Sequence, residues 1–583
     1  MTAIATHPPK PALGRFKLGQ MKLGPTLLLV LMALLVGLPL VFLVLGSFST
    51  AKLPSDLSWA NLGLANYAKV WGSRSTYDVI SNTFIYVVGA TAFGIVMATA
   101  LAWLTERTNM PGKIWVYGGV TMTLAIPGML QAMAWVLLFS PRIGFVNVFF
   151  KNLLGLEAMP FNIYTLTGLV VVEGLRLVPT AFLMLVPLLR SMDPALEEAA
   201  AMSGANQRST LRKVTMRLML PGLVAVVIYQ AITALEVFEV PGILGLPGGI
   251  YVFSTKIYSI LYTPMGTPEY GQANALAIIY VFIAVAAIWL YSRVIRRSER
   301  FTIVSGKGYR PRLNDLGHWR WAGVLFVFLF MLFAIILPFL TLLYVSFLPF
   351  LQAPSIKAFN AMSLRNYTTI WNMELIGTVM RNTALLVVVT STATVVFSFL
   401  VSIIVVRSKF WGRKLLDQLA FLPHAIPGMV IGLAFFWMFL QFEKVNIPIH
   451  GGILAISIVF TVGFMAYGTR SMNAAILQIH KDLEEAAQTS GAPTWRVMWR
   501  IFLPLLMPTV IGVWIWTMLH AVRNAGVPLI LYEGSDHQVL SVLIWNLWDQ
   551  GQMGMVAAIG TLMIVGLLLL TFCLRFVRFG ARA

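Results

Sequence analysis

The sequence is poor in the residues that soluble enzymes use for chemistry. Charged residues make up only 11% of its 583 positions, and 22 acidic residues stand against 42 basic ones. The single cysteine, Cys573, excludes a disulfide within the chain. The seven histidines are dispersed, and no His/Cys cluster has the spacing of a metal site. We therefore expect neither catalytic residues nor a metal centre in this chain.

A phosphate-binding loop is also missing. No G-x-x-x-x-G-K-S/T motif occurs, because the pair Gly306-Lys307 is followed by Gly308 and lacks the upstream glycine. We therefore expect the chain neither to hydrolyse ATP nor to hold a cofactor of its own. No cleavable signal pattern precedes the first apolar run, so we expect that run to remain in the protein.

Apolar residues dominate instead, at 58% of the chain. They form recurrent runs near 20 residues, each long enough to cross a bilayer core of roughly 30 Å. We predict an all-α, polytopic membrane protein with about 12 transmembrane helices. The predicted spans are residues 25–48, 79–104, 114–139, 163–189, 219–240, 272–293, 321–347, 380–406, 416–440, 452–474, 505–528 and 556–577.

The formal net charge of +20 indicates membrane topology rather than nucleic-acid binding. The basic residues lie in short loops between apolar runs, as the positive-inside rule requires, and not on one soluble face. Basic residues also flank the first and last spans, and an even number of spans returns the chain to its starting side. We therefore predict that both termini are cytoplasmic. The flanking residues are Lys10, Arg15, Lys17, Lys22, Arg575, Arg578 and Arg582.

The chain contains an internal duplication. Asn66-Tyr67 matches Asn366-Tyr367, and the run at 125–129 matches that at 425–429, all at an offset of 300. Later matches have an offset of 287, so the first half carries 13 extra residues, which we place within 141–160. Six spans per repeat give two parallel repeats about an axis along the membrane normal. The predicted divisions are a cytoplasmic tail (1–24), a first repeat (25–293), a cytoplasmic linker (294–320) and a second repeat (321–583).

A polar loop occurs once in each half, at residues 197–222 and 484–509. Each copy begins Glu-Glu-Ala-Ala, a strong helix former, and has a glycine seven residues after the first Glu, which can end a helix in the left-handed conformation. Asp482 suits a helix start and Pro493 the first turn of the next helix. Each copy therefore predicts a short helix, a sharp glycine turn and a second helix that re-enters the membrane.

This pattern of Glu-Ala-Ala, glycine and a later Leu-Pro resembles the cytoplasmic loop of binding-protein-dependent ABC importer permeases. The second copy keeps Leu503-Pro504 at the family's spacing, whereas the first has Arg217 at the matching place and Leu220-Pro221 further on. The resemblance implies that the short helix docks on an ABC ATPase dimer, which would bind ATP and Mg. The implied ATPase-coupling residues are Glu197, Glu198, Ala199, Ala200, Gly204, Glu484, Glu485, Ala486, Ala487 and Gly491.

The linker stretch 306–312, with 237–242 and 270–273, looks like fused permeases of the ferric-iron type. The resemblance implies a bacterial inner-membrane importer that receives ferric iron from a periplasmic solute-binding protein. Related fused permeases are assigned to thiamine, phosphonates and polyamines, so these remain alternative cargoes. An ion-coupled secondary transporter is a rival class, although the doubled loop and the scarcity of paired acids in mid-span argue against it. A channel or a structural membrane protein is weaker still.

A few charged residues lie inside predicted spans, where they are costly and tend to face the bundle interior or water. They pair within the bundle and fix helix packing, lie close enough to the interface to be solvated, or line the path of the cargo. Glu236 matches Arg523 in the second repeat, so we expect these two to approach each other across the pseudo-axis. The candidate pathway residues are Glu173, Arg176, Glu236, Glu239 and Arg523.

The third span of each half contains a Pro-Gly pair, which removes a backbone hydrogen bond and loosens packing. We expect each pair to kink or break its helix. The break is either a fixed feature of the bundle or a hinge for alternating access. The candidate hinge residues are Pro127, Gly128, Pro427 and Gly428.

Overall fold

The computed structural model describes residues 23–124, 126–190, 199–200, 202–204, 206–210, 216–263, 267–298 and 313–580. These parts of the chain are helical, with isolated bridges at Ser49–Leu62, Thr108–Asn314 and Gly451–Tyr532 as their only extended pairing. The predicted all-α class is therefore confirmed.

The first half contains the following elements. They are α1 (Leu23–Phe48), η2 (Pro54–Asp56), η3 (Trp59–Asn61), α2 (Ala65–Gly72), α3 (Arg74–Arg107), α4 (Lys113–Thr123), α5 (Gly128–Phe139), α6 (Phe145–Leu154), α7 (Leu166–Arg190), α9 (Gln207–Thr210), α10 (Met216–Glu236), η5 (Pro241–Gly245), α11 (Phe253–Leu261) and α12 (Tyr270–Ser298).

The second half repeats this order. Its elements are η7 (Gly317–Trp319), α13 (Arg320–Met331), η8 (Leu332–Ile336), α14 (Leu337–Ser346), α15 (Ile356–Asn360), α16 (Arg365–Trp371), α17 (Glu374–Arg407), α18 (Arg413–Phe421), η9 (Leu422–Ala425), α19 (Gly428–Glu443), α20 (Ile453–Gln478), α21 (Lys481–Thr489), α22 (Thr494–Val497), η10 (Met498–Phe502), α23 (Leu503–Arg523), α24 (Gly526–Leu531), η11 (Ser535–His537), α25 (Leu540–Asp549) and α26 (Met553–Gly580).

All twelve predicted spans fall on helices. Within the described residues, nine helices are long and apolar enough to cross a membrane, and the bent pairs α4–α5 and α18–α19 raise the number to eleven. The twelfth prediction, 556–577, lies in α26, whose stretch Met553–Leu569 is apolar. The predicted 13-residue insertion is also found, because α6 lies within 141–160 and no corresponding helix stands between α19 and α20.

The duplication is visible in the packing of each half. Helices α3 and α17 have the same length and the same offset of 300 as the sequence repeat. Each packs most extensively on the fourth span of its own half, α7 or α20. Small residues allow this approach: a Cβ at Gly94 would lie 2.9 Å from the Gly174 carbonyl oxygen. Such close contact is how membrane helices associate without a hydrophobic driving force.

The repeated Asn and Thr residues make the same hydrogen bonds in both halves. Thr83 Oγ1 accepts from the backbone N–H of Phe253 at 3.1 Å, and Thr383 Oγ1 accepts from that of Leu540 at 2.9 Å. Likewise Asn66 donates to the Ser47 and Ser49 carbonyls, as Asn366 does to those of Ser346 and Leu348. These residues satisfy backbone groups where helices end, which explains why the motifs occur twice.

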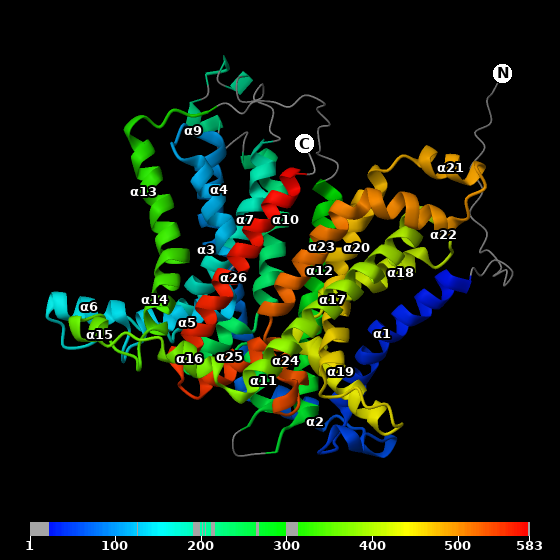
Figure 1. Ribbon diagram of the computed structural model, residues 1–583, viewed down its shortest axis with the longest axis horizontal. Helices are drawn as coiled ribbons and strands as arrows, with labels where there is room; N and C mark the ends of the chain where they lie inside the picture. The colour runs from blue at the N-terminus through cyan, green and yellow to red at the C-terminus, as the bar shows by residue number, and fades with distance from the viewer. Residues whose placement is uncertain are drawn as a thin grey trace.

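The first helix of each half packs on the third span of the other half. Helix α1 contacts α18 and α19, while α14 contacts α5 and η8 contacts α4. Figure 1 shows α1 beside α19 at one side of the bundle and α13 beside α4 at the other. The two halves are therefore interlocked by exchanged helices.

The joint between the halves begins after Ser298, where α12 ends, and residues 299–312 lie outside the described parts. On the far side, Asn109 holds the incoming chain by donating to Asp315 at 2.5 Å and accepting from the Leu316 N–H at 3.0 Å. The Gly317 N–H and the Asn109 side chain both donate hydrogen bonds to the Asp315 carboxylate. These bonds, the one from Gly317 above all, hold the pKa of the Asp315 carboxyl below its usual value.

The bundle has two distinct faces. We call the face that carries α9, α21 and α22 the loop face, and the face that carries α2, α11, α24 and α25 the opposite face (Figure 1). Helices α6 and α15 project sideways at the level of the opposite face.

Candidate functional site

The fifth span of each half is discontinuous. Helix α10 ends at Glu236 and helix α23 ends at Arg523, which are matching positions in the repeat. The spans predicted at 219–240 and 505–528 are therefore shorter as continuous helices. After each break the chain continues into a short helix, η5 in the first half and α24 in the second. Breaks of this kind are tolerated at membrane depth only where the backbone is buried in protein or lines a cavity.

Both breaks are stabilised in the same way. The Ser254 hydroxyl donates to the Val237 carbonyl at 3.0 Å, and the Ser541 hydroxyl donates to the Asn524 carbonyl at 3.0 Å. The Tyr280 hydroxyl also donates to the Leu235 carbonyl. Carbonyls freed at a helix end need such donors away from water, so the breaks are built into the sequence of each half.

The third spans are broken at the predicted Pro-Gly pairs. Helices α4 and α5 meet at 100° across Pro127, and the helices on either side of Pro427 meet at 109°. Gly128 and Gly428 are the first residues of the helices that follow. The expected break is confirmed at both places, while a hinge motion there stays a prediction.

A cluster of charged and polar side chains lies where these broken helices converge. We call it the central polar cluster, and it consists of Glu173, Arg176, Glu236, Glu239, His520 and Arg523. Glu173 is fully buried and holds Arg176 through two hydrogen bonds, at 2.8 and 2.5 Å. This pair joins successive turns of α7, so the internal-pairing interpretation is correct for it.

Arg523 joins the two halves at the cluster. Its guanidinium donates to the Leu124 carbonyl at 2.5 Å, at the C-terminal end of α4, and lies 3.0 Å from His520 Nε2. Conversely, the Glu239 carboxylate of the first half accepts a hydrogen bond from the backbone N–H of Ala525 in the second half, at 3.4 Å. Each half thus supplies a charged side chain to a backbone break of the other.

The expected Glu236–Arg523 ion pair is wrong for this conformation. No ion pair or hydrogen bond joins the two side chains among the described residues, since Arg523 is directed to the α4 carbonyl. Glu236 is half-buried and sits at the C-terminal end of α10, where the helix dipole is unfavourable to a carboxylate. Glu236 and Arg523 match in the repeat but do not touch, because the helices that carry them end at breaks with different neighbours.

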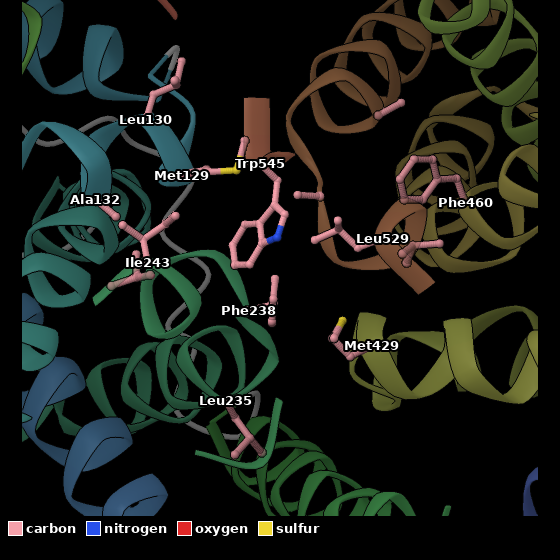
Figure 2. Close-up of a cluster of buried hydrophobic side chains, with 14 of the residues drawn as sticks. Met129, Leu130, Ala132, Leu235, Phe238, Ile243, Met429, Phe460, Leu529 and Trp545 are labelled. Carbon is pink, nitrogen blue, oxygen red and sulfur yellow. The ribbon is translucent and has the colours of Figure 1, made fainter. Parts of the chain in front are cut away.

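A cluster of apolar side chains lies beside the central polar cluster, where the two halves meet. We call it the plug, and its members are Met129, Phe238, Met429 and Trp545, which Figure 2 shows gathered from both halves. The Phe238 and Trp545 rings are 5.2 Å apart, and Trp545 Nε1 donates to the Tyr258 hydroxyl at 3.2 Å. All four plug residues are buried, so the two halves meet here through apolar side chains.

A pocket of about 350 Å³ lies at the opposite face, between the halves. Its wall includes Tyr262, Tyr270 and Phe436, together with His450 and Glu533, whose Nδ1 and Oε2 atoms are 3.1 Å apart. In the described parts of the chain, no group of three or more His, Cys, Asp or Glu side chains is placed to hold a metal ion. The pocket therefore offers aromatic surface and one carboxylate, and not a chelating cage.

The two copies of the polar loop share their geometry at the loop face. The Ser203 hydroxyl donates to the Ala199 carbonyl at 2.8 Å, and the Ser490 hydroxyl to the Ala486 carbonyl at 2.8 Å. The next residue is a glycine in each copy, with φ of 81° at Gly204 and 79° at Gly491. The left-handed glycine turn predicted from the sequence is confirmed in both copies.

The other predicted loop residues are placed as follows. Glu197 and Glu198 lie outside the described residues. Ala199 and Ala200 precede the first turn, and Glu484, Glu485, Ala486 and Ala487 lie on α21. Glu485 is exposed, whereas Glu484 is half-buried against the bundle. Of the two acidic residues in this copy, Glu485 therefore faces solvent and Glu484 faces the bundle.

Sequence reasoning missed His520, the plug and Arg407. His520 stands three residues before Arg523 on the same helix, a spacing that identifies one helical face. Arg407 matches Arg107 at the repeat offset of 300, which would have singled out both. The plug has no such signal, because single aromatic and Met residues are common throughout a membrane protein.

Comparison with known proteins gives the same division of the chain. The family described as binding-protein-dependent transport system inner membrane component matches twice, over residues 90–300 and 395–582. The ferric transport system permease protein FbpB of Actinobacillus pleuropneumoniae is 26% identical over 507 residues, covering 85% of this chain and 70% of the relative. The Fe(3+)-transport system permease protein FbpB 2 of Haemophilus influenzae is 20% identical over 524 residues, or 89% of this chain and 92% of the relative.

A shorter relative has the length of one half. The trehalose/maltose transport system permease protein MalF of Thermococcus litoralis is 26% identical over 299 residues. The alignment takes in 96% of that protein but 48% of this chain. A separate permease thus corresponds to about half of the chain.

Proposed function

The chain belongs to the family of binding-protein-dependent transport system inner membrane components, with the family domain present twice, and from this premise we propose how it is driven and what it carries. It is the fused permease of an ABC importer, and proteins of this family work with an ATPase and a solute-binding protein. We propose that the loop face and both termini are cytoplasmic. A separate ATPase dimer binds ATP and Mg and performs the hydrolysis, and this chain is not catalytic.

The two polar loops are the docking sites for the ATPase dimer in this proposal. Leu483 on α21 and Trp495 on α22 are large apolar side chains that remain 49% and 60% exposed. Exposed apolar residues beside the acidic Glu485 suit a protein partner better than water. The glycine turns at 204 and 491 fix the angle between the docking helix and the helix that re-enters the membrane.

The cargo path runs through the central polar cluster. A solute-binding protein docks on the opposite face, where the plug is closed in this conformation, and the half-buried Glu236 and Glu239 lie beyond the plug. ATP-driven closure of the ATPases moves the loops and turns the path towards the receptor. Discontinuous helices at the bilayer midplane are where transporters of several folds bind their cargo, which supports this placement.

Ferric iron is the cargo that we propose. Two relatives that are named as ferric-iron transport permeases align with this chain, one over 85% and the other over 89% of its length. Glu236 and Glu239 provide carboxylate oxygens, which suit hard cations, and Arg176 is already neutralised by Glu173. The absence of a chelating cage among the described residues fits a path that binds weakly, because the receptor supplies the affinity.

The coupling test uses the Glu198→Arg/Glu485→Arg double variant in membranes that also contain the ATPase. We expect normal insertion, loss of ATPase co-purification and at least a tenfold loss of uptake. A matched charge reversal at the exposed Glu157, just after the laterally projecting α6, is the control: Glu157→Arg should keep both properties. If the double variant retained ATPase binding and transport, the loops would not be the docking sites.

The cargo test measures ATP-dependent uptake of radioactive iron from the ferric-loaded receptor into vesicles. Glu236→Gln/Glu239→Gln should lower the uptake and leave ATPase co-purification unchanged. Uptake of thiamine, a phosphonate or a polyamine in place of iron would identify the alternative cargo. Uptake driven by an ion gradient without ATP would instead indicate a secondary transporter.

A further inference from the structure

Arg407 occupies an unusual place at the loop face. It is the last residue of α17, and its side chain is only 8% exposed although it carries a permanent charge. The Nη2 group donates to the Ile476 carbonyl at 2.9 Å and to the Ile479 carbonyl at 2.5 Å. These carbonyls belong to the C-terminal end of α20, where backbone acceptors have no partner within the helix. Arg407 therefore caps α20 from a neighbouring span.

The same guanidinium extends to the docking helix. Its Nη1 atom lies 4.0 Å from Glu484 Oε2 on α21, and its Cζ atom lies 5.4 Å from the centre of the Phe502 ring in η10. A guanidinium can do this because it offers five donors in a rigid plane and can lie over an aromatic ring. One side chain thus connects α17, α20, α21 and the start of the fifth span.

An apolar cluster lies directly beneath this contact. It is separate from the main core and joins α17, α20, α22, η10 and α23. Its buried members are Phe399, Ile403, Ile476, Val497, Phe502 and Leu506. Helix α21 contributes none of these buried side chains, although its partly buried Ala487 packs against the cluster, and among the described residues its most extensive helix contact is with the short α22. The polar contact with Arg407 therefore ties α21 to the spans in addition to the small apolar contact of Ala487.

We propose that Arg407 is a positioning residue that clamps the docking helix α21 to the second, fourth and fifth spans of its half. A displacement of α21 is then delivered to these spans as the motion of one rigid unit. In the first half, Arg107 occupies the position that matches Arg407 in the sequence. Arg107 is itself buried, at 2% exposure. The clamp rests on the proposed function, since transmission requires α21 to contact the ATPase.

The first experiment tests the clamp without the ATPase. Backbone hydrogen exchange is measured on the purified full-length permease in detergent, for the parent and for Arg407→Gln. We expect the amides of residues 481–492 to exchange about tenfold faster or more, the factor for losing a charge-assisted hydrogen bond. The amides of residues 453–470 should be unchanged.

Two further variants serve as controls. Arg413→Gln removes a cation that donates to the Ser408 carbonyl at 3.0 Å and that, among the described residues, makes no hydrogen bond or ion pair with α21, so it should leave the exchange unchanged. Arg407→Lys keeps the charge but has one ammonium for several acceptors, and should give an intermediate acceleration. Unchanged exchange of residues 481–492 in a folded Arg407→Gln protein would overturn the clamp.

The second experiment measures coupling in the complex with the ATPase and receptor. Arg407→Gln should retain ATPase binding while the cargo moved per ATP hydrolysed falls about tenfold, because α21 moves without its spans. A faster exchange with an unchanged transport ratio would overturn the transmission role. It would leave the docking proposal, which the Glu198→Arg/Glu485→Arg variant tests, standing.

Discussion

The fully buried Glu173 illustrates how a single charge is accommodated inside the bundle. Its carboxylate is balanced by Arg176 one turn away on α7, with two hydrogen bonds and little exposure to water. Removing one partner of such a pair leaves the other charged and unpaired, which costs more than removing both.

A substitution of Glu173 should therefore destabilise the protein. We expect Glu173→Gln to lower the free energy of unfolding by about 3–5 kcal/mol, seen as a lower melting temperature in detergent. The double variant Glu173→Leu/Arg176→Leu should recover part of the loss. Equal melting of the parent and the single variant would show that the pair has no structural role.

The glycine turns give a second prediction for single residues. No atom lies within 4 Å of a Cβ built at Gly204 or Gly491, so only the positive φ opposes a side chain. Gly491→Val should cost more than the roughly 1–2 kcal/mol of a left-handed residue and reduce coupling. Gly491→Asn is the matched control, since Asn tolerates this conformation. Equal uptake by the two variants would count against a need for the left-handed turn.

Glu236 and Arg523 make no contact here, so their energies should be independent. Melting of Glu236→Gln, Arg523→Gln and the double variant should show additivity within about 0.5 kcal/mol. A double variant clearly more stable than either single one would mean that the two side chains pair in another conformation of the transporter.

At the scale of elements, four breaks in helices surround the central polar cluster. The Pro-Gly pairs make two of them, and the ends of α10 and α23 make the others. Although they match in the repeat, their surroundings differ. A Cβ at Gly128 would lie 3.1 Å from Arg176 Cδ, whereas a Cβ at Gly428 would lie 3.7 Å from Val527 Cγ2.

This difference separates the two breaks experimentally. Gly128→Ala should displace Arg176 and lower both uptake and stability, while Gly428→Ala meets only an ordinary contact and should be tolerated. Uptake and melting temperature measured on both variants provide the check. Equal damage by the two substitutions would indicate that flexibility, rather than space beside Arg176, is what each glycine supplies.

Much of this arrangement could be predicted from the sequence. The apolar runs located the helices on which all twelve predicted spans fall, because lipid demands long apolar helices, and the left-handed glycines followed from the loop pattern. The ends of α10 and α23 could not be foreseen, because each freed carbonyl is satisfied by a serine hydroxyl from a later helix, α11 or α25. The partner of Arg523 was also hidden, since the Leu124 carbonyl is available only after α4 has been broken.

For the whole molecule, the exchange of first helices determines how the halves hold together. Helix α1 packs on α18 and α19, and α14 on α5, so the interface does not depend on the linker. The linker residues 299–312 lie outside the described parts, and the described chain resumes at the Asn109–Asp315 contact.

Cutting the linker should therefore leave a functional protein. We expect chains 1–305 and 306–583, produced together, to co-purify and to restore most of the uptake. Chain 1–305 produced alone should be degraded, because α4 and α5 then expose the surface that α13 and α14 cover. Failure of the two chains to associate would assign the assembly to the covalent connection.

The fusion of two halves with different fifth spans also determines how many copies of each half a transporter contains. A complex of two first halves would place a carboxylate at both positions that Glu236 and Arg523 now occupy, and two second halves would place a guanidinium at both. Each mispaired complex would carry like charges in a low-dielectric interior. Joining the halves in one polypeptide fixes their ratio during synthesis, so every transporter receives one acidic and one basic fifth span however strongly its gene is expressed.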